Sequence, residues 1–524
     1  MRVKGNGQPS LFVDGEWATA EGEESVCCEG SEGIRYDDPS PEGILIGLES
    51  LRDYLQERGL EEVIRLRELL RSLDWSEFEE RYSRAGRPGY HPAAMVGLIV
   101  LGLMQGRSSL RGIEELARSD VRAWWVSGGV QPDHSAIGHF IRQHEGSLSG
   151  EFFEEVTREL IGRVGGGKGR LAGDGTLVQA AASSYRRLSV EAAQAAAEQA
   201  EKEAAQAVAE DKEEAQRRAQ HKRQVAEVAR ERQSNRRRYG RSGEIRVSPG
   251  EPEAAILRKG AGRAKPSYQP TVLADEKRMV VGQAVATTSE KAVLAELVEQ
   301  AMRTQGEVKE LLLDGGYHDG QLARRMLEQG VENILCPSGR AVGDGPWEKD
   351  QGGGPFSRRH FHYDSEQDLY ECPAGQQLRP LKRGRERGQP YVLYGGPACQ
   401  QCEFKQQCTR SPSGRRIRRL QGEDYAEAMK EVLRDQRAQQ VYRKRKCMVE
   451  PVFSELKCIQ GLRRFRRRGL SAVRVEFALH CLTYNLRRFL ALTRANPEPQ
   501  NRFCGLFDWL FRPLWLEKLR YCAA

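Results

Sequence analysis

The sequence of 524 residues has no apolar run long enough to cross a membrane. Its longest such run covers residues 93–104, whereas a membrane-spanning helix needs about 20 apolar residues. Residues 1–17 also lack the apolar core of a secretory signal. We therefore expect a soluble protein in the cytoplasm.

Because an export signal is lacking, the twelve cysteines do not indicate a disulfide framework. Four of them follow a pattern in the segment 338–420, which is rich in Gly and Arg and poor in apolar residues. A small subdomain with few apolar residues needs an added cross-link for stability. A C-x2-C pair with two further thiols predicts that this cross-link is a structural Zn²⁺ site. The predicted ligands are Cys372, Cys399, Cys402 and Cys408, with His360 and His362 as substitutes. Free thiols on a mobile loop are the alternative.

The net charge of +8 is modest for this length, but the basic residues are unevenly distributed. Residues 441–470 hold ten Lys or Arg residues against two acids. Such a concentration indicates contact with a phosphate backbone, although a solvated surface is the plain alternative. The bases predicted to follow DNA are Lys457, Arg463, Arg464, Arg466, Arg467 and Arg468, with Phe465 able to stack or pack.

Hydrophobic periodicity divides the chain into segments. Residues 1–40 have little periodicity and predict a flexible leader. Residues 41–164 repeat apolar positions at helical spacing and predict an all-helical domain for DNA binding or assembly. Within it, Asp133 suits the N-cap of a short helix that could read a DNA groove, although ordinary packing is the alternative.

After residue 169 the pattern changes to strands that later alternate with helices. This order predicts an α/β fold, a mixed sheet flanked by helices, in two parts at 170–337 and 421–495. The cysteine-rich segment 338–420 separates them, and residues 496–524 form a C-terminal tail.

A helical insertion is predicted at 183–240, because the run from Ser183 to Tyr239 contains no Gly or Pro. Its first half is acidic and its second half basic, and large apolar residues are nearly absent. We expect a projecting helix or a hairpin whose halves attract each other. Its role is either a solvated spacer or an arm that contacts DNA or a second subunit.

Three acids stand at boundaries between predicted elements. Asp174 lies in the first strand, Asp314 ends a later one, and Glu450 follows four consecutive bases. Around Glu450, the apolar residues Val449, Val452, Phe453 and Leu456 form a helical stripe that would face the sheet. Pro451 suits the first turn of a helix, so we expect the helix to begin or kink beside Glu450.

In this order, the motifs resemble the DDE-type transposases of bacterial insertion sequences. The resemblance rests on the helical segment at 91–125, on DGT and LLLDGGYHD around the two aspartates, and on VEPVFSELK with the tail that follows it. It implies a ribonuclease-H-like catalytic domain in which Asp174, Asp314 and Glu450 are the catalytic residues and metal ligands. It also implies a nucleoid-associated enzyme that forms a homodimer or larger assembly on DNA.

The sequence departs from the family's Tyr–Arg–Glu–Lys signature in one respect. Tyr442 and Arg445 each lie one residue farther from Glu450 than the family spacing, and Lys446 takes the place of the Arg. We keep Tyr442, Arg445 and Lys446 as predicted DNA-binding residues, and Lys457 matches the family interval. Glu455 is the weaker choice of glutamate.

Converging carboxylates repel each other unless a multivalent cation neutralises them, and such oxygen ligands suit two Mg²⁺ or Mn²⁺ ions. The resemblance thus implies metal-dependent cleavage at terminal inverted repeats and strand transfer into target DNA. Two alternatives stay open: a nuclease or resolvase that cuts without joining, and a catalytically inactive DNA-binding copy.

Overall fold

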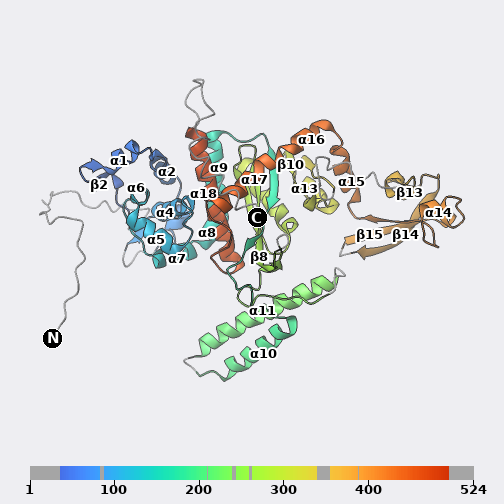
Figure 1. The fold of residues 1–524 in the computed structure, drawn as a ribbon, viewed down its shortest axis with the longest axis horizontal. Coiled ribbons are helices and arrows are strands. Elements are labelled where there is room, and N and C mark those ends of the chain that lie inside the picture. Colours follow the sequence, from blue (N-terminus) through green and yellow to red (C-terminus); the bar gives the residue numbers. More distant parts are fainter. Residues whose placement is uncertain are drawn as a thin grey trace.

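The computed structural model describes residues 36–82, 88–208, 211–238, 243–258, 262–338, 354–386 and 389–494. Most of the predicted leader and all of the predicted tail lie outside these residues. Figure 1 shows a helical N-terminal part on one side of a central sheet and a small second sheet on the other. A pair of helices projects away from the centre.

The N-terminal part contains a set of helices packed around one apolar helix. That central helix, α4 (Pro92–Met104), is buried on nearly every side because its residues are apolar all round. Around it lie α1 (Leu51–Glu57), α2 (Glu61–Arg71), α3 (Ser76–Glu79), α5 (Leu110–Ser119), α6 (Val121–Ser127), α7 (His134–Gln143), α8 (Glu145–Ser149) and α9 (Glu151–Val164).

Two details of the N-terminal prediction can be compared with the structure. Asp133 is the N-cap of α7, as predicted, and accepts a hydrogen bond from the Ala136 N–H at 2.6 Å. The all-helical description is wrong in detail, because two pairs of two-residue strands also occur. They are β1 (Tyr36–Asp37) with β4 (Gly89–Tyr90), and β2 (Leu45–Ile46) with β3 (Glu49–Ser50). Strands of two residues are too short to show the alternation of apolar and polar residues by which strands are recognised in a sequence.

The central sheet mixes parallel and antiparallel strands. Its main path is β11 (Asn333–Leu335), β10 (Glu310–Leu312), β5 (Arg170–Gly175), β8 (Lys265–Asp275) and β9 (Val280–Ala286). β11, β10 and β5 are mutually parallel, whereas β8 is antiparallel to both β5 and β9. Two short strands, β6 (Val178–Gln179) and β7 (Ala255–Leu257), also pair with β8.

Helices from the second half of the chain cover this sheet, and α9 also packs on β9. Those from the second half are α12 (Leu294–Gln305), α13 (Gly320–Glu328), α15 (Glu423–Val432), α16 (Gln436–Arg443), α17 (Arg445–Cys458) and α18 (Leu470–Arg494). α17 packs on β5 and β8, and α18 packs on β9, α4, α8 and α9. α18 therefore joins the N-terminal helices to the sheet.

One buried amide on α18 completes the hydrogen bonding of β9. Asn485 accepts a hydrogen bond from the Val280 N–H at 2.8 Å and donates to the Val280 carbonyl at 2.8 Å and to the Thr157 hydroxyl at 3.0 Å. We expect Asn485→Leu to destabilise the protein by about 1–3 kcal/mol for each backbone group left unpaired. Urea denaturation measures this loss. Asn333→Leu, at an exposed position on β11, is the control, and an equal effect of both changes would contradict the assignment.

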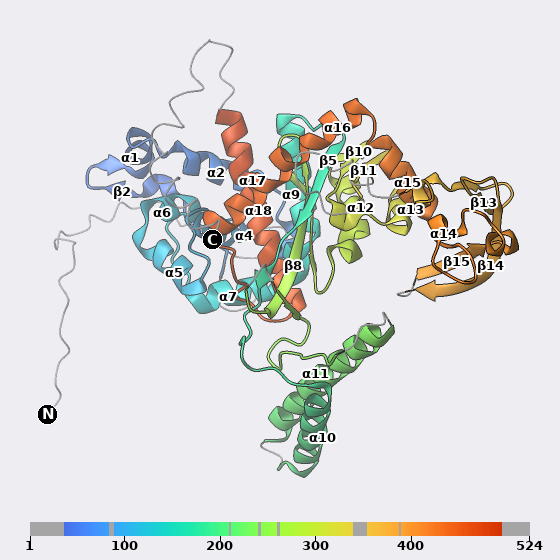
Figure 2. The ribbon, with the colours of Figure 1, turned by 45° about the vertical axis from the view of Figure 1, so that its right-hand side comes forward.

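The charged insertion forms a hairpin of two helices. α10 (Val190–Gln206) and α11 (Lys212–Arg238) pack against each other, so the long helical run is broken near its middle. Small residues make the contact, with Ala193 and Ala197 against Val225, Ala226 and Ala229. Of the two expectations, a single projecting helix or a hairpin, the structure shows the hairpin, and its alanines allow close approach of the two helices. The hairpin projects from the body of the protein (Figures 1 and 2).

The cysteine-rich segment forms a five-stranded antiparallel sheet. Its strands are β12 (His362–Asp364), β13 (Leu369–Glu371), β14 (Gln377–Glu386), β15 (Gln389–Gly395) and β16 (Arg416–Leu420), paired in chain order. Phe361, Tyr370, Leu378, Tyr394 and Ile417 form a small core of its own. This core is larger than the composition predicted, since aromatic residues supply most of it.

Candidate active site

Asp174 lies at the end of the central strand β5, with β10 on one side and β8 on the other. In the parallel pair of β5 and β10, Ala172 stands opposite Leu312. Asp174 and Asp314 each follow two residues later, so both aspartates emerge at the same edge of the sheet. Asp314 caps the short helix η3 (Gly315–Tyr317), accepting a hydrogen bond from the Gly316 N–H at 2.8 Å.

Glu450 comes to this edge from α17. The predicted apolar stripe of α17, Val449, Val452, Phe453 and Leu456, is buried, and Glu450 is exposed. Figure 2 shows α17 beside β5, and the two elements are in contact. The weaker choice, Glu455, turns instead toward α18, where its carboxylate lies 3.6 Å from the Arg487 guanidinium.

The helix does not begin beside Glu450, so one of the two expectations is wrong. α17 starts at Arg445, so Pro451 lies inside the helix rather than in its first turn. Burial of the apolar stripe stabilises the helix on both sides of this proline, which tertiary packing can do against local propensity.

The three acids interact electrostatically. Burial raises the pKa of Asp174, and the negative charges of Asp314 and Glu450 raise it further, whereas Arg445 lowers it. The Arg445 guanidinium lies 3.1 Å from the Asp174 carboxylate and donates to the Gly173 carbonyl at 3.3 Å. The side chain of Arg445 is only 8% exposed. A residue predicted to bind DNA is thus placed as the buried partner of Asp174.

The donor chemistry of this edge fits a divalent cation. The Asp174 carboxylate experiences the negative charges of Asp314 and Glu450, and Arg445 offsets part of that charge. Hard oxygen-ligated ions stabilise such a set of like charges. Among the residues that the structure describes, no three acidic, cysteine or histidine side chains stand in a ready-made metal-holding arrangement. The fit of a divalent cation at this edge therefore rests on the chemistry of the three carboxylates and on the register of β5 and β10.

The other predicted DNA-binding residues are divided between structural contacts and open surface. The Tyr442 ring is half-buried, and burial raises its pKa to about 12, whereas Arg445 lowers that pKa. Lys457 donates to the Thr176 hydroxyl next to β5, and Arg464 donates to the Ala180 carbonyl at 3.1 Å.

Phe465 and the arginines after it are likewise divided between structural contacts and exposed surface. Phe465 is buried against Tyr268, so it packs rather than stacks on a base. Arg466 donates to the Ser108 hydroxyl at 2.7 Å, and burial lowers the pKa of Arg467. Exposed side chains remain on Lys446, Arg463, Arg464, Arg466 and Arg468.

The four predicted zinc ligands come together. Cys372, Cys399, Cys402 and Cys408 line one small cavity. Burial raises the pKa of Cys408, and the other three thiols raise it further. His360 and His362, the predicted substitutes, are not among the residues that line this cavity, and His362 is exposed.

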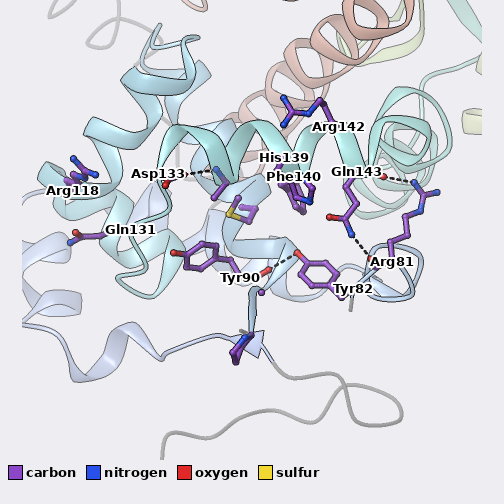
Figure 3. Close-up of a pocket in the computed structure, with 14 residues that line it drawn as sticks. Arg81, Tyr82, Tyr90, Arg118, Gln131, Asp133, His139, Phe140, Arg142 and Gln143 are labelled. Atoms are coloured by element: carbon purple, nitrogen blue, oxygen red, sulfur yellow. Dashed lines mark hydrogen bonds between the residues drawn. The ribbon is translucent and has the colours of Figure 1, made fainter. Parts of the chain in front are cut away.

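A second concave feature lies beside α7 in the N-terminal part. It is a cleft of about 1040 Å³, shown in Figure 3. Three arginines, two tyrosines and a histidine contribute to its lining, namely Arg81, Arg118, Arg142, Tyr82, Tyr90 and His139. The helix predicted to read a DNA groove therefore borders a basic, aromatic cleft.

One further acid, not predicted from the sequence, lies near Asp174 at the end of β5. Glu290 lies in the helix η2 (Glu290–Val293) after β9, and its carboxylate packs on Gly175. Residues 289–292 (SEKA) are typical of an ordinary helix start, and no local sequence pattern predicts that the Glu290 carboxylate contacts β5.

Two models of known families match parts of this chain. A model of a transposase DDE domain matches residues 371–490, which include Glu450, α17 and most of α18. A model of a transposase domain (DUF772) matches residues 51–143, which include α1 to α7. These matches support a DDE-type transposase of an insertion sequence. No curated protein matches it in sequence.

The two matches confirm the resemblance found in the sequence. Transposases act on DNA, and DDE transposase domains use divalent metal ions. Asp174 and Asp314 lie outside both matched segments, so their assignment rests on the sheet register and on the interactions described above. No helix in the described part of this transposase is long and apolar enough to span a membrane.

Proposed function

We propose that this transposase cleaves DNA at terminal inverted repeats and transfers the resulting ends into target DNA, at a site formed by Asp174, Asp314 and Glu450. The observation that carries the proposal is the register of β5 and β10, which brings Asp174 and Asp314 to one edge, with Glu450 presented there by α17. The strand order of the central sheet also supports a ribonuclease-H-like core.

In this proposal the three carboxylates hold two Mg²⁺ or Mn²⁺ ions. When bound, the ions activate a water or a 3′-hydroxyl and stabilise the leaving oxygen of an in-line phosphoryl transfer. Arg445 orients Asp174 through its ion pair and stabilises the edge when the carboxylates are charged.

The experiment that tests the function uses DNA carrying the element's own ends. The transposase is incubated with this DNA, a target plasmid and Mg²⁺, and the products are analysed for 3′-hydroxyl ends and joined molecules. Both products are expected. Cleavage without joining would instead indicate a nuclease or resolvase. The absence of both products would indicate a catalytically inactive DNA-binding copy.

DNA is proposed to reach the site along the exposed bases after α16, and the cleft beside α7 is proposed to contact the end sequence. Electrostatic contact with phosphates releases counterions, so binding weakens with salt by a slope of about −0.9 for each phosphate contact. A synaptic homodimer or larger assembly is part of the same proposal.

Neutralising two exposed bases tests this path. We expect Lys446→Ala with Arg468→Ala to weaken DNA binding and to reduce the salt slope by about 2, because two phosphate contacts are lost. Fluorescence anisotropy at several salt concentrations measures both quantities. Lys309→Ala is a matched control, since Lys309 precedes β10 and so lies at the opposite sheet edge from Asp314. An unchanged affinity and slope in the double variant would make the basic stripe only a solvated surface.

The four clustered cysteines are proposed to hold one structural Zn²⁺. Their thiol donor set suits tetrahedral zinc, and the small sheet that they join has a core of few residues. The ion would then link the segment after β13 to the segment around α14 (Lys405–Cys408).

A further inference from the structure

An exposed tyrosine lies on a turn whose backbone is held in place. Of the large apolar residues that are exposed in the described part of the chain, Tyr185 is the only aromatic one, and it is 87% exposed. Its N–H donates to the Ser183 hydroxyl at 3.3 Å. The next residue, Ser184, accepts hydrogen bonds from the Arg187 guanidinium at 3.0 Å and from the Gln179 amide at 3.3 Å. A ring presented on a fixed backbone loses little conformational freedom when it binds a flat partner.

This turn follows the strand that carries Asp174. β6 continues β5 along β8 in the same register, since Gly175 pairs with Thr271 and Gln179 with Ser267. At about 3.3 Å per residue, the chain from Asp174 to Gln179 covers roughly 16 Å, the length of about five base-pair steps of DNA. The turn therefore lies beyond the edge of the sheet at which Asp174 emerges, within reach of DNA that occupies the proposed active site.

The segment before the turn is in direct contact with residues 463–468, here called the arginine loop. The Phe465 N–H donates to the Gln179 carbonyl at 2.8 Å. The Arg464 guanidinium donates to the Ala182 carbonyl at 3.3 Å, three residues before the exposed tyrosine. The arginine loop and the turn are therefore neighbouring parts of one surface.

Two buried carboxylates hold the arginine loop by its backbone. Glu251 accepts hydrogen bonds from the Ala182 N–H at 2.5 Å and from the Gly469 N–H at 3.4 Å, so it joins the segment before the turn to the end of the loop. Glu476 accepts from the Arg467 N–H at 2.9 Å. The loop is thus fixed while several of its side chains face solvent. These exposed side chains are Arg463, Arg464, Arg466 and Arg468.

We propose that Tyr185 stacks on a nucleobase of the bound DNA, several base pairs from the cleaved phosphate, while the arginine loop contacts the adjoining phosphates. This inference rests on the proposed function, since it takes DNA as the occupant of the active site. Charge complementarity favours DNA as the partner of this surface, because the exposed guanidinium groups beside the ring match a phosphate backbone. Every nucleobase offers a flat face to an aromatic ring.

Replacing the ring tests the contact without relying on activity. We expect Tyr185→Ala to weaken binding of duplex DNA that carries the element's own end by roughly 5- to 150-fold, the range typical of stacking on one base. Tyr185→Phe should keep most of the affinity, because it keeps the ring. Leu48→Ala, at another exposed apolar residue, is the control. Anisotropy without metal measures binding, and the salt slope of Tyr185→Ala should equal that of the unmodified chain, because no phosphate contact is lost.

Abasic sites placed one at a time along the end DNA identify the base. At one position, the abasic site should weaken binding by the same factor as Tyr185→Ala, and the two changes together should cause little further loss. Unchanged affinity of Tyr185→Ala, or losses that add at every position, would overturn the inference. If the unmodified protein neither cleaves nor joins end DNA, the proposed function fails, and the coupling at one position decides the inference separately.

Discussion

Asp174→Asn, Asp314→Asn and Glu450→Gln are each expected to abolish DNA cleavage while specific end binding is retained. Each substitution removes a negative charge but almost no volume, so the site loses metal-binding capacity and keeps its shape. We expect cleavage to fall by roughly three orders of magnitude or more, comparable with the loss of a group that stabilises transition-state charge. Cleavage is measured on labelled end DNA with Mg²⁺, and binding by anisotropy without metal.

Glu455→Gln is the matched control for this prediction. Glu455 lies on the same helix as Glu450, but its carboxylate faces Arg487 on α18. Substitution of Glu455 should therefore leave cleavage close to normal. Near-normal cleavage by Glu450→Gln would remove Glu450 from the site. Loss of cleavage in Glu455→Gln alone would transfer the assignment to that residue.

The second large effect is expected from joint substitution of Cys399→Ser and Cys402→Ser. Purified protein should contain about one zinc per chain, and the double variant should contain none. Because structural zinc sites contribute about 10–16 kcal/mol in small zinc peptides at neutral pH, the segment from β12 to β16 should become sensitive to protease. The central sheet has its own core and should stay folded.

Cys447→Ser serves as the control, because Cys447 is exposed on α17 and far along the chain from the cluster. It should leave the zinc content and the protease pattern unchanged. Protein that is free of metal, folded and equally resistant to protease in the segment from β12 to β16 would exclude the zinc site and leave four free thiols.

The helices of the N-terminal part were largely predictable, because helix formation there follows from patterns among neighbouring residues. The apolar run of α4 and the cap at Asp133 are features of neighbouring residues, and each acts over one or two turns. The two-residue strands in the same part were missed, because their pairing joins residues far apart in the sequence.

The central sheet shows the same division. The sequence predicted a mixed sheet after residue 169, with Asp174 in its first strand and Asp314 at the end of a later one, but strand order depends on non-local hydrogen bonds. The start of α17 was also misplaced, since local propensity favours Pro451 in a first turn. Burial of the stripe that includes Val449 and Val452 outweighs that preference.

The sequence alone determined the family and the three candidate acids, because motif residues occur in a characteristic order along the chain. Only the tertiary structure decided what surrounds those acids. Arg445 is a buried partner of Asp174, and Glu290 stands against Gly175, although more than 100 residues separate the members of each pair. Contacts of this kind depend on strand register and on helix packing across the sheet, and short-range sequence patterns carry no information about either.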